Sequence, residues 1–229
     1  MTSSNAKAIP VVFIPALLCD GALYEGVIAE LGDSIEAHVM MSPKPDMADS
    51  VTAILANAPD TFVLVGTSYG GNLALRVALA APERVSALWL MGCDPAGPQP
   101  GGPNLAGGLE TTPEGVFDLL AGLVVKPTHT RAAATFKLMA KRVGAASGAA
   151  QARAIASRED VTGRLATLTM PALVLWGEDD ALVPVAVGQK LTHALPCARF
   201  EVLPDCGHLP TLENPSESVA LFKSFLDRQ

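Results

Sequence analysis

Residues 62–75, FVLVGTSYGGNLAL, place a serine between an apolar run and a helix-like segment. At the centre is the pattern G-x-S-x-G, in which Gly66 and Gly70 flank Ser68. A strand before such a serine and a helix after it are the context of a sharp turn that exposes the hydroxyl above a sheet. We expect the glycines to be required because side chains there would collide with the neighbouring strand and helix, and because glycine tolerates strained backbone angles best.

This five-residue pattern has two interpretations. It can be a packing turn that uses small residues between a strand and a helix, since short motifs also arise without the chemistry. It can also present a nucleophile, because the first N–H groups of the following helix point at the turn and favour negative charge that develops there. The strand before Ser68 and the helix after it favour the second interpretation.

Apolar runs alternate with amphipathic stretches along most of the chain. Strands that alternate with helices of ordinary length imply βαβ units and a parallel sheet. Asp46 is placed to cap a helix, because its side chain can accept from the free N–H groups of the first turn. We expect strands near residues 8–16, 34–41, 61–68, 84–92, 170–177 and 198–204, and helices near residues 21–32, 46–58, 70–81, 183–195 and 215–226.

Residues 95–160 interrupt this alternation. The segment opens with PAGPQPGGPNLAGG, a loop dense in Pro and Gly, and shows no strand pattern. Helix-like stretches follow near residues 113–124, 128–143 and 146–158. We therefore expect an α/β core made of residues 1–94 and 161–229, with residues 95–160 inserted as a small helical cap.

The composition narrows the class of protein. Of the 229 residues, 49% are hydrophobic and 17% are charged, which is enough apolar content for a substantial core. The net charge of −7 and the lack of a Lys/Arg cluster in the sequence disfavour nucleic acid and anionic membranes as partners. The apolar runs also fall short of the roughly 18 residues that a membrane helix needs.

The N-terminal stretch and the cysteines indicate in which cellular compartment the protein is expected. Lys7 is the one basic residue before the first apolar run, which contains Pro10 and Pro15, so the stretch lacks the arrangement of a signal peptide. The four cysteines have no CxxC spacing, which argues against a zinc site or a redox motif. We therefore expect a cytoplasmic protein without a metal.

A serine hydroxyl is a weak nucleophile unless a base lies beside it. His208 is the best candidate, because LPDCGHLPTLENP places it in a loop directly after an expected strand. Ligands of α/β sheets bind outside the carboxyl ends of the strands. The other histidines lie in a strand pattern, in the insertion and on a polar helix face; they are His38, His129 and His193.

The base in turn needs a carboxylate to orient it. LVLWGEDDALVP supplies Asp179 and Asp180 just past another expected strand, with Glu178 as a weaker candidate. Adjacent acids in a turn are usually solvated, so neither aspartate is convincing alone. Asp94 also follows a strand, after LWLMGC, and is a fallback acid.

The chain resembles the α/β-hydrolase superfamily, within its small-cap group of esterases, lactonases and aryl-ester hydrolases. Four blocks carry the resemblance over essentially the whole chain: VVFIPALLCDG, VLVGTSYGGNLAL, MPALVLWGEDDALVP and LPDCGHLPTLENP. The order Ser68, Asp180, His208 is the one found in that superfamily. In its acid loop a Gly precedes the catalytic Asp by three places and a Pro follows four further on. Gly177 and Pro184 match this, so the resemblance favours Asp180 over its neighbour.

The resemblance implies an α/β-hydrolase fold with a mostly parallel sheet of about six strands, flanked by helices and covered by a small helical cap. The N-terminal edge hairpin is expected to be lacking, because the chain enters with the strand that relatives place third. Pro15 and Ala16 stand where relatives usually have His-Gly. By resemblance the backbone N–H groups of Leu17 and Tyr69 form the oxyanion hole, with Ala16 as the alternative to Leu17.

These residues and the resemblance together predict a serine hydrolase that cleaves a small-molecule ester or lactone through an acyl-enzyme, without a cofactor. Other chemistry of the superfamily stays open: carbon–carbon bond hydrolysis, thioester hydrolysis, lyase or perhydrolase activity, or, less favoured, a ligand receptor. Cap side chains either line the site or pack between helices; the apolar candidates are Leu119, Leu120, Leu123, Phe136, Leu138 and Met139. Cap cations either bind an anionic substrate or face solvent; they are Arg131, Lys137, Lys141 and Arg142.

Overall fold

The computed structural model describes residues 8–98 and 101–228, so residues 1–7 and 229 of the expected core, and 99–100 of the expected cap, lie outside the described residues. A six-stranded sheet with the order β2-β1-β3-β4-β5-β6 forms the centre. The strands are β1 (Ile9–Ile14), β2 (Ile35–Val39), β3 (Phe62–Thr67), β4 (Val85–Met91), β5 (Ala172–Gly177) and β6 (Ala198–Leu203).

All the pairings between these strands are parallel, and within the described part of the chain no antiparallel hairpin extends the edge. Every residue of β3 and β5 is buried, as expected for strands covered by helices on both faces. The expected parallel sheet of about six strands flanked by helices is therefore confirmed.

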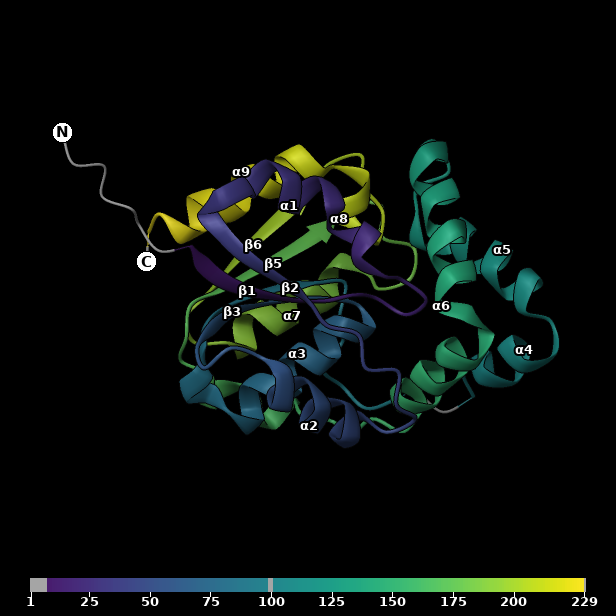
Figure 1. The fold of residues 1–229 in the computed structure, drawn as a ribbon, viewed down its shortest axis with the longest axis horizontal. Helices are drawn as coiled ribbons and strands as arrows, with labels where there is room; N and C mark the ends of the chain where they lie inside the picture. The colour runs from purple at the N-terminus through teal and green to yellow at the C-terminus, as the bar shows by residue number, and fades with distance from the viewer. Residues whose placement is uncertain (1–7, 99–100, 229) are drawn as a thin grey trace.

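Helices form a layer on each face of the sheet, as Figure 1 shows. One face carries α1 (Glu25–Leu31), α8 (Pro210–Glu213) and α9 (Pro215–Leu226), and Trp89 of β4 stacks on Phe222 of α9 at 4.3 Å between ring centroids. The other face carries α2 (Met47–Asn57), α3 (Tyr69–Ala80) and α7 (Val185–Ala194). Asp46 caps α2 as expected, since its side chain accepts from the N–H groups of Ala48 and Asp49.

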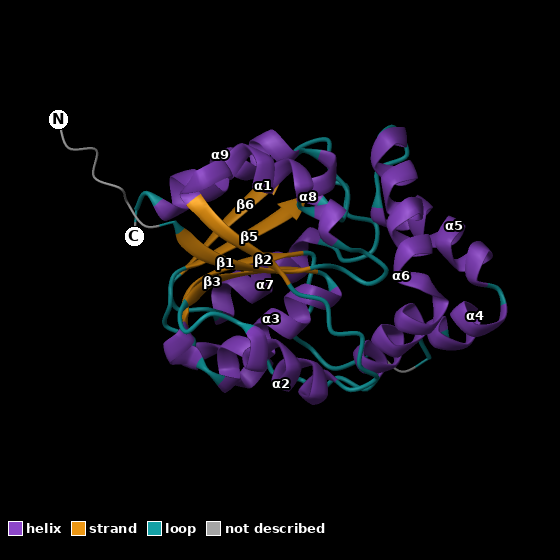
Figure 2. Ribbon diagram, viewed as in Figure 1, coloured by secondary structure: helices purple, strands orange, loops and turns teal. Residues whose placement is uncertain are grey.

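Three helices between β4 and β5 lie beyond the end of the sheet at which the strand arrows point (Figures 1 and 2). They are α4 (Leu105–Thr111), α5 (Pro113–Val124) and α6 (Thr130–Ala156). We call them the cap, although the boundaries of the cap as a separate unit stay a prediction.

The cap differs from expectation at its start. The expected loop of residues 95–108 ends earlier, because α4 begins at Leu105, where the Asn104 side chain accepts from Gly107 N–H and caps the helix. The sequence did not predict this short helix because Gly107 and Gly108 have low helix propensity. The expected break near residue 145 is present, since Gly144 has a φ of 80° inside α6.

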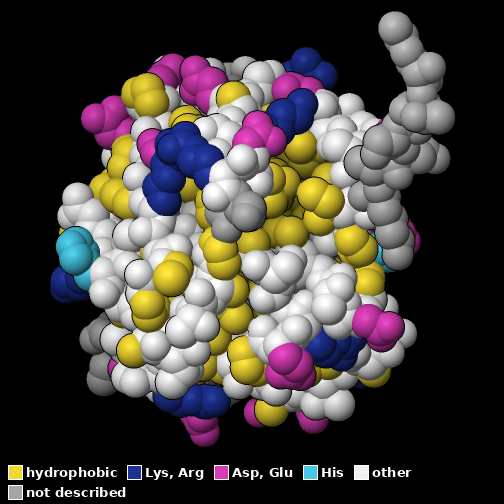
Figure 3. Space-filling model, turned by 90° about the vertical axis from the view of Figure 1, so that its left-hand side faces the viewer, with side chains coloured by type: hydrophobic (Ala, Val, Ile, Leu, Met, Phe, Trp, Pro, Cys, Tyr) yellow, Lys and Arg dark blue, Asp and Glu magenta, His cyan; other side chains and the backbone are white. Residues whose placement is uncertain are grey.

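The surface of the molecule mixes charged and hydrophobic side chains. On the face shown in Figure 3, Lys and Arg lie close to Asp and Glu, and hydrophobic side chains gather toward the centre of the face. Among the described residues, no helix combines the length and the apolar content needed to cross a membrane.

Candidate active site

Ser68 occupies a strained turn between β3 and α3. Its φ of 56° and ψ of −117° are unfavourable for a residue with a side chain, at a cost of about 1–3 kcal/mol. The expectation of backbone strain at the glycines is wrong, because neither Gly66 nor Gly70 has a positive φ. The expected collisions are confirmed. A Cβ on Gly70 would lie 2.0 Å from the Ile14 carbonyl oxygen, and one on Gly66 would lie 2.4 Å from the Gly70 carbonyl oxygen.

The serine opens onto a cavity of about 830 Å³ at the carboxyl end of the sheet. The cavity reaches from the end of β4 to the acid loop after β5, and α4 and the end of α6 cover it. Its polar lining includes Asn72, Asp94, Glu110, Arg153 and Arg158, and its apolar lining includes Leu105, Ile155, Leu182 and Val187. A pocket with an apolar body, a few polar groups and a strained serine is suited to a small molecule.

Asp180 and His208 meet in the interior. His208 Nδ1 lies 2.7 Å from Asp180 Oδ2, and both side chains are 1% exposed. The other carboxylate oxygen of Asp180 accepts from the N–H groups of Leu182 (2.9 Å) and Val183 (2.8 Å), which fixes its orientation. An imidazole that donates from Nδ1 keeps a lone pair on Nε2.

Glycine allows the two loops to meet. Gly177 ends β5, and a Cβ on it would lie 1.9 Å from the Gly207 carbonyl oxygen in the loop after β6. No other residue could stand at position 177 without separating the two loops. The acid loop and the histidine loop are therefore in direct main-chain contact just before Asp180 and His208.

Ser68 and His208 contact the same segment at the end of β4. The Ser68 N–H donates to the Met91 carbonyl at 2.8 Å, while a Cβ on Gly92 would lie 2.7 Å from His208 Cε1. His208 Nε2 is buried and has no hydrogen-bond partner among the described residues, Ser68 included. The structure thus joins Asp180 to His208 and brings Ser68 to their side of the sheet, with Nε2 still unpaired.

The candidate oxyanion donors come from the start of α3 and from the loop after β1. Tyr69 is the first residue of α3, whose hydrogen bonds begin with Asn72 N–H to the Ser68 carbonyl (3.0 Å), so the Tyr69 N–H precedes the helical bonds. Leu17 follows β1, next to Leu18, which has a left-handed φ of 61°. The Leu18 N–H donates to Gln151 Oε1 of α6 at 3.0 Å, so a buried cap side chain fixes the main chain beside Leu17.

The remaining acids near the site have other partners. Asp179 Oδ2 lies 2.6 Å from Lys126 Nζ, and hydrogen bonds to Asp179 and Asp205 raise the pKa of Lys126. The Asp94 side chain accepts from the Ala96 N–H at 3.0 Å. Glu178 is exposed. His208 therefore has Asp180 as its carboxylate partner.

Cysteines do not offer a rival nucleophile in this region. Cys19 and Cys206 are buried free thiols. Burial raises the pKa of both thiols, so the reactive thiolate is disfavoured. Within residues 8–98 and 101–228, no group of three or more His, Cys, Asp and Glu side chains is arranged to hold a metal ion.

The apolar cap candidates pack between helices or face solvent. Phe136 and Met139 are 1% and 0% exposed and Leu120 is also buried, whereas Leu119 and Leu138 are 60% and 57% exposed. The residues that line the cavity of Ser68 include none of the six candidates. Helix packing is therefore the better interpretation of the buried ones.

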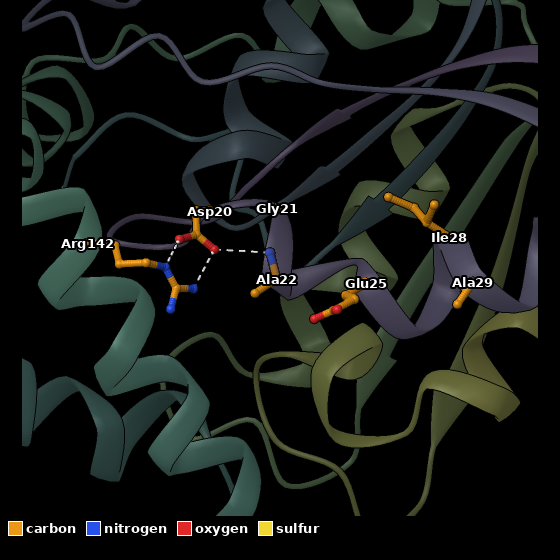
Figure 4. A pocket seen from close by; sticks show the side chains of 7 residues that line it. All are labelled: Asp20, Gly21, Ala22, Glu25, Ile28, Ala29 and Arg142. Atoms are coloured by element: carbon orange, nitrogen blue, oxygen red, sulfur yellow. Dashed lines mark hydrogen bonds and ion pairs between the residues drawn. The ribbon is translucent and has the colours of Figure 1, made fainter.

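The cap cations are largely paired with acids. Lys137 lies 2.7 Å from Asp118, and Lys141 lies 3.3 Å from Glu114. Arg142 reaches from α6 to Asp20, where its Nε and Nη2 lie 2.7 and 3.0 Å from the two carboxylate oxygens, as Figure 4 shows. Burial would raise the pKa of Asp20, but the hydrogen bonds from Arg142 and Ala22 outweigh it and lower the pKa.

Sequence reasoning missed two buried polar side chains, Gln151 and Glu213. Gln151 is the lone amide in the stretch GAASGAAQARAIA, and Glu213 is the lone acid in HLPTLENP after His208. A lone amide or a lone acid among mostly apolar or small residues was the available signal, because a buried polar group is retained where it has hydrogen-bond partners.

Comparison with known proteins identifies the family and the fold. The model of the alpha/beta hydrolase family matches residues 12–221. The chain is similar to a thermophilic esterase from Thermogutta terrifontis, with a TM-score of 0.86, 21% identity, and coverage of 97% of this chain and 91% of that one. At that identity the likeness establishes the fold, so the expected α/β-hydrolase fold is confirmed.

Two curated relatives differ in how much of their length is matched. A 2-hydroxy-6-oxononadienedioate/2-hydroxy-6-oxononatrienedioate hydrolase from a Pseudomonas species is 31% identical over 177 residues, which cover 72% of this chain and 62% of the relative. The chain thus spans about three fifths of that protein. A pimeloyl-[acyl-carrier protein] methyl ester esterase from Nitrosomonas europaea is 25% identical over 223 residues, which cover 87% of this chain and 88% of the relative.

Proposed function

Because the chain belongs to the alpha/beta hydrolase family, we propose that it is a serine hydrolase that cleaves a carboxylic ester or lactone through an acyl-enzyme. Ser68 is the nucleophile, His208 the general base and Asp180 the carboxylate that holds His208. The N–H groups of Leu17 and Tyr69 form the oxyanion hole. The observation that carries the proposal is the buried 2.7 Å contact between His208 Nδ1 and Asp180, which leaves Nε2 without a partner among the described residues.

The proposed reaction conserves every proton. Ser68 Oγ attacks the carbonyl carbon, His208 Nε2 takes the hydroxyl proton, and the carbonyl oxygen becomes an oxyanion that accepts from the hole. His208 returns the proton to the leaving oxygen as the carbon–oxygen bond breaks and the acyl-enzyme forms. Water then attacks the acyl carbon, His208 takes its proton, and the Ser68 oxygen leaves with that proton. One oxyanion donor contributes about 3 kcal/mol to such a reaction.

Charges around the cavity support an uncharged reacting region. Arg153 forms an ion pair with Glu110. Arg158 Nη1 donates to the Ile155 carbonyl (2.8 Å) and its Nε to the Ala96 carbonyl (2.9 Å). The two lining arginines are matched in number by the two lining acids, Asp94 and Glu110, so the cavity carries no excess positive charge to attract a dicarboxylate.

Hydrolysis of a carbon–carbon bond in a 2-hydroxy-6-oxo-dienedioate is the second candidate, because a hydrolase of that name is 31% identical over the matched region. Two observations weigh against it. The balance of charge in the cavity lining is one. The other is length, since the match spans 62% of that hydrolase but 88% of the methyl ester esterase.

A substrate panel tests the proposal. The purified protein is assayed with p-nitrophenyl esters of increasing acyl length, a series of lactones, and 2-hydroxy-6-oxononadienedioate. We expect turnover of an ester or lactone, stoichiometric inactivation by a serine-directed organophosphate, and no turnover by Ser68→Ala. Turnover that persists in Ser68→Ala would contradict the proposal. Turnover confined to the dienedioate would favour the second candidate, and ligand binding without turnover would favour a receptor.

A further inference from the structure

Glu213 is a buried carboxylate at the end of α8, in the segment that follows His208. Its side chain is 0% exposed. Burial of a carboxylate is unfavourable unless hydrogen bonds replace the water that it loses. Four nitrogen atoms surround this one: the backbone N–H groups of Gly207 (3.0 Å), Leu209 (3.1 Å) and Lys126 (2.9 Å), and Nδ1 of His129 (3.0 Å).

Two of these partners are the residues on either side of His208. Oε2 of Glu213 accepts from Gly207 and Oε1 from Leu209. The His208 N–H itself donates to the carbonyl of Val124, the last residue of α5, at 3.2 Å. Three consecutive N–H groups of the histidine loop are therefore held, two by Glu213 and one by the cap. A main chain fixed in this way restricts where the imidazole of His208 can point.

The other two partners belong to the cap. Lys126 and His129 lie in residues 125–129, which connect α5 to α6 and which we call the α5–α6 turn. Lys126 Nζ also lies 2.6 Å from Asp179 and 2.5 Å from Asp205. The α5–α6 turn is thus bound to the acid loop beside Asp180 and to the histidine loop.

We propose that Glu213 is a positioning residue for His208 and that it joins the histidine loop to the α5–α6 turn. The carboxylate touches no reacting atom. It acts through the main chain of residues 207–209, so that Nδ1 of His208 meets Asp180 and Nε2 faces the serine. The inference rests on the proposed function, in which His208 is the general base.

Glu213→Gln tests the role, with Glu217→Gln as the matched control. The amide of the variant presents an NH2 group to partners that are themselves donors, so at least one N–H loses its acceptor. Glu217 is exposed, four residues further along the same segment. We expect kcat for the best ester to fall roughly ten- to hundredfold in Glu213→Gln, because a displacement of about 1 Å at a reacting group has effects of that size. KM should change less than twofold, and the control should match the wild type.

A second readout separates positioning from general loss of structure. We expect the Nδ1 proton that His208 shares with Asp180 to give a downfield 1H NMR resonance in the wild type. That resonance should broaden or disappear in Glu213→Gln while far-UV circular dichroism is unchanged. His129→Ala removes one of the four partners and is expected to fold even if the Glu213 variant does not. We expect it to lower kcat by two- to fivefold with KM retained.

The outcomes are distinguishable. Wild-type kcat and an unchanged downfield resonance in folded Glu213→Gln would overturn the positioning role, and so would an unaffected His129→Ala if Glu213→Gln cannot be purified. A loss of activity that tracks the loss of circular dichroism would assign a structural role alone and would also overturn it. Turnover by Ser68→Ala would remove the proposed function itself, whatever the Glu213 variants do.

Discussion

The carboxyl edge of the sheet and the cap are held by different kinds of contact. At the edge, main chain meets main chain: a Cβ on Gly177 would lie 1.9 Å from the carbonyl of Gly207, and β3 and β5 are buried throughout. The cap reaches the same region mostly through individual side chains, such as Gln151 to Leu18 and Arg142 to Asp20, and through one main-chain hydrogen bond from His208 to Val124. Changes at the edge should therefore remove function or folding outright, and changes in the cap should have graded effects.

The largest effect should distinguish two adjacent acids. Asp180→Asn removes the carboxylate that faces His208 and should lower kcat by about 10⁴-fold, as the loss of this group does in other triads. Asp179 faces Lys126 instead, so Asp179→Asn should lower kcat less than about tenfold. Initial rates with the best ester measure both. Equal losses would mean that the two acids share the role.

A backbone change at the edge should come next. Gly177→Ala places a methyl group against the carbonyls of Gly207 and Cys206, which are parts of a rigid main chain. We expect the free energy of unfolding to fall by more than about 3 kcal/mol, with loss of activity. Urea unfolding measures it, with Gly163→Ala as control because nothing lies within 4 Å of a Cβ there. Similar stability of the two variants would refute the close approach of the loops.

A cap change beside the oxyanion hole should have a smaller effect. Gln151→Leu leaves the buried Leu18 N–H without an acceptor, which costs about 1–3 kcal/mol, and frees the main chain next to Leu17. We expect kcat to fall by about tenfold. Gln189→Leu on the exposed face of α7 is the control. An unchanged kcat in Gln151→Leu would show that Gln151 of the cap does not position the proposed oxyanion donor, the Leu17 N–H.

The smallest effect should come from the Arg142–Asp20 pair. Arg142 is 52% exposed, so Asp20→Asn should change the free energy of unfolding by less than about 1 kcal/mol. The folded-state pKa of Asp20 lies below its ordinary value of 3.8. The contribution is therefore present above pH 3.8 and lost as the pH falls through the lower folded value. Unfolding curves of both proteins at pH 7 and pH 3 measure the difference. A difference that grows at pH 3 would contradict this sign.

The sequence predicted the structure of the core better than that of the cap. Hydrophobic runs placed β3 and β5 correctly because burial on both faces leaves a continuous apolar pattern. In the cap, the first residues of α4 were expected as loop because their Gly-rich sequence has low helix propensity. The helix forms nevertheless, and the Asn104 side chain caps it. The long-range contacts of the cap could not be predicted: Gln151 and Leu18 are separated by 133 residues, and no local pattern relates them.

The candidate site shows the same division. Motif spacing and the family resemblance predicted Ser68, Asp180 and His208, because the chemistry requires those residue types at strand ends. The features around them were not accessible, since the left-handed backbone of Ser68 and the fourfold coordination of Glu213 depend on the packed loops. The role of each residue in catalysis stays a prediction for experiment.

The most direct test of the account is the identity of the acylated residue. The protein is mixed with a p-nitrophenyl ester, quenched in acid within the first turnover and digested, and the peptides are analysed by mass spectrometry. The account predicts that the acyl group is on the peptide that contains Ser68, and that it accumulates to one per chain. Hydrolysis of the ester with the acyl group on another residue would contradict the account. Hydrolysis with no acylated peptide would also contradict it.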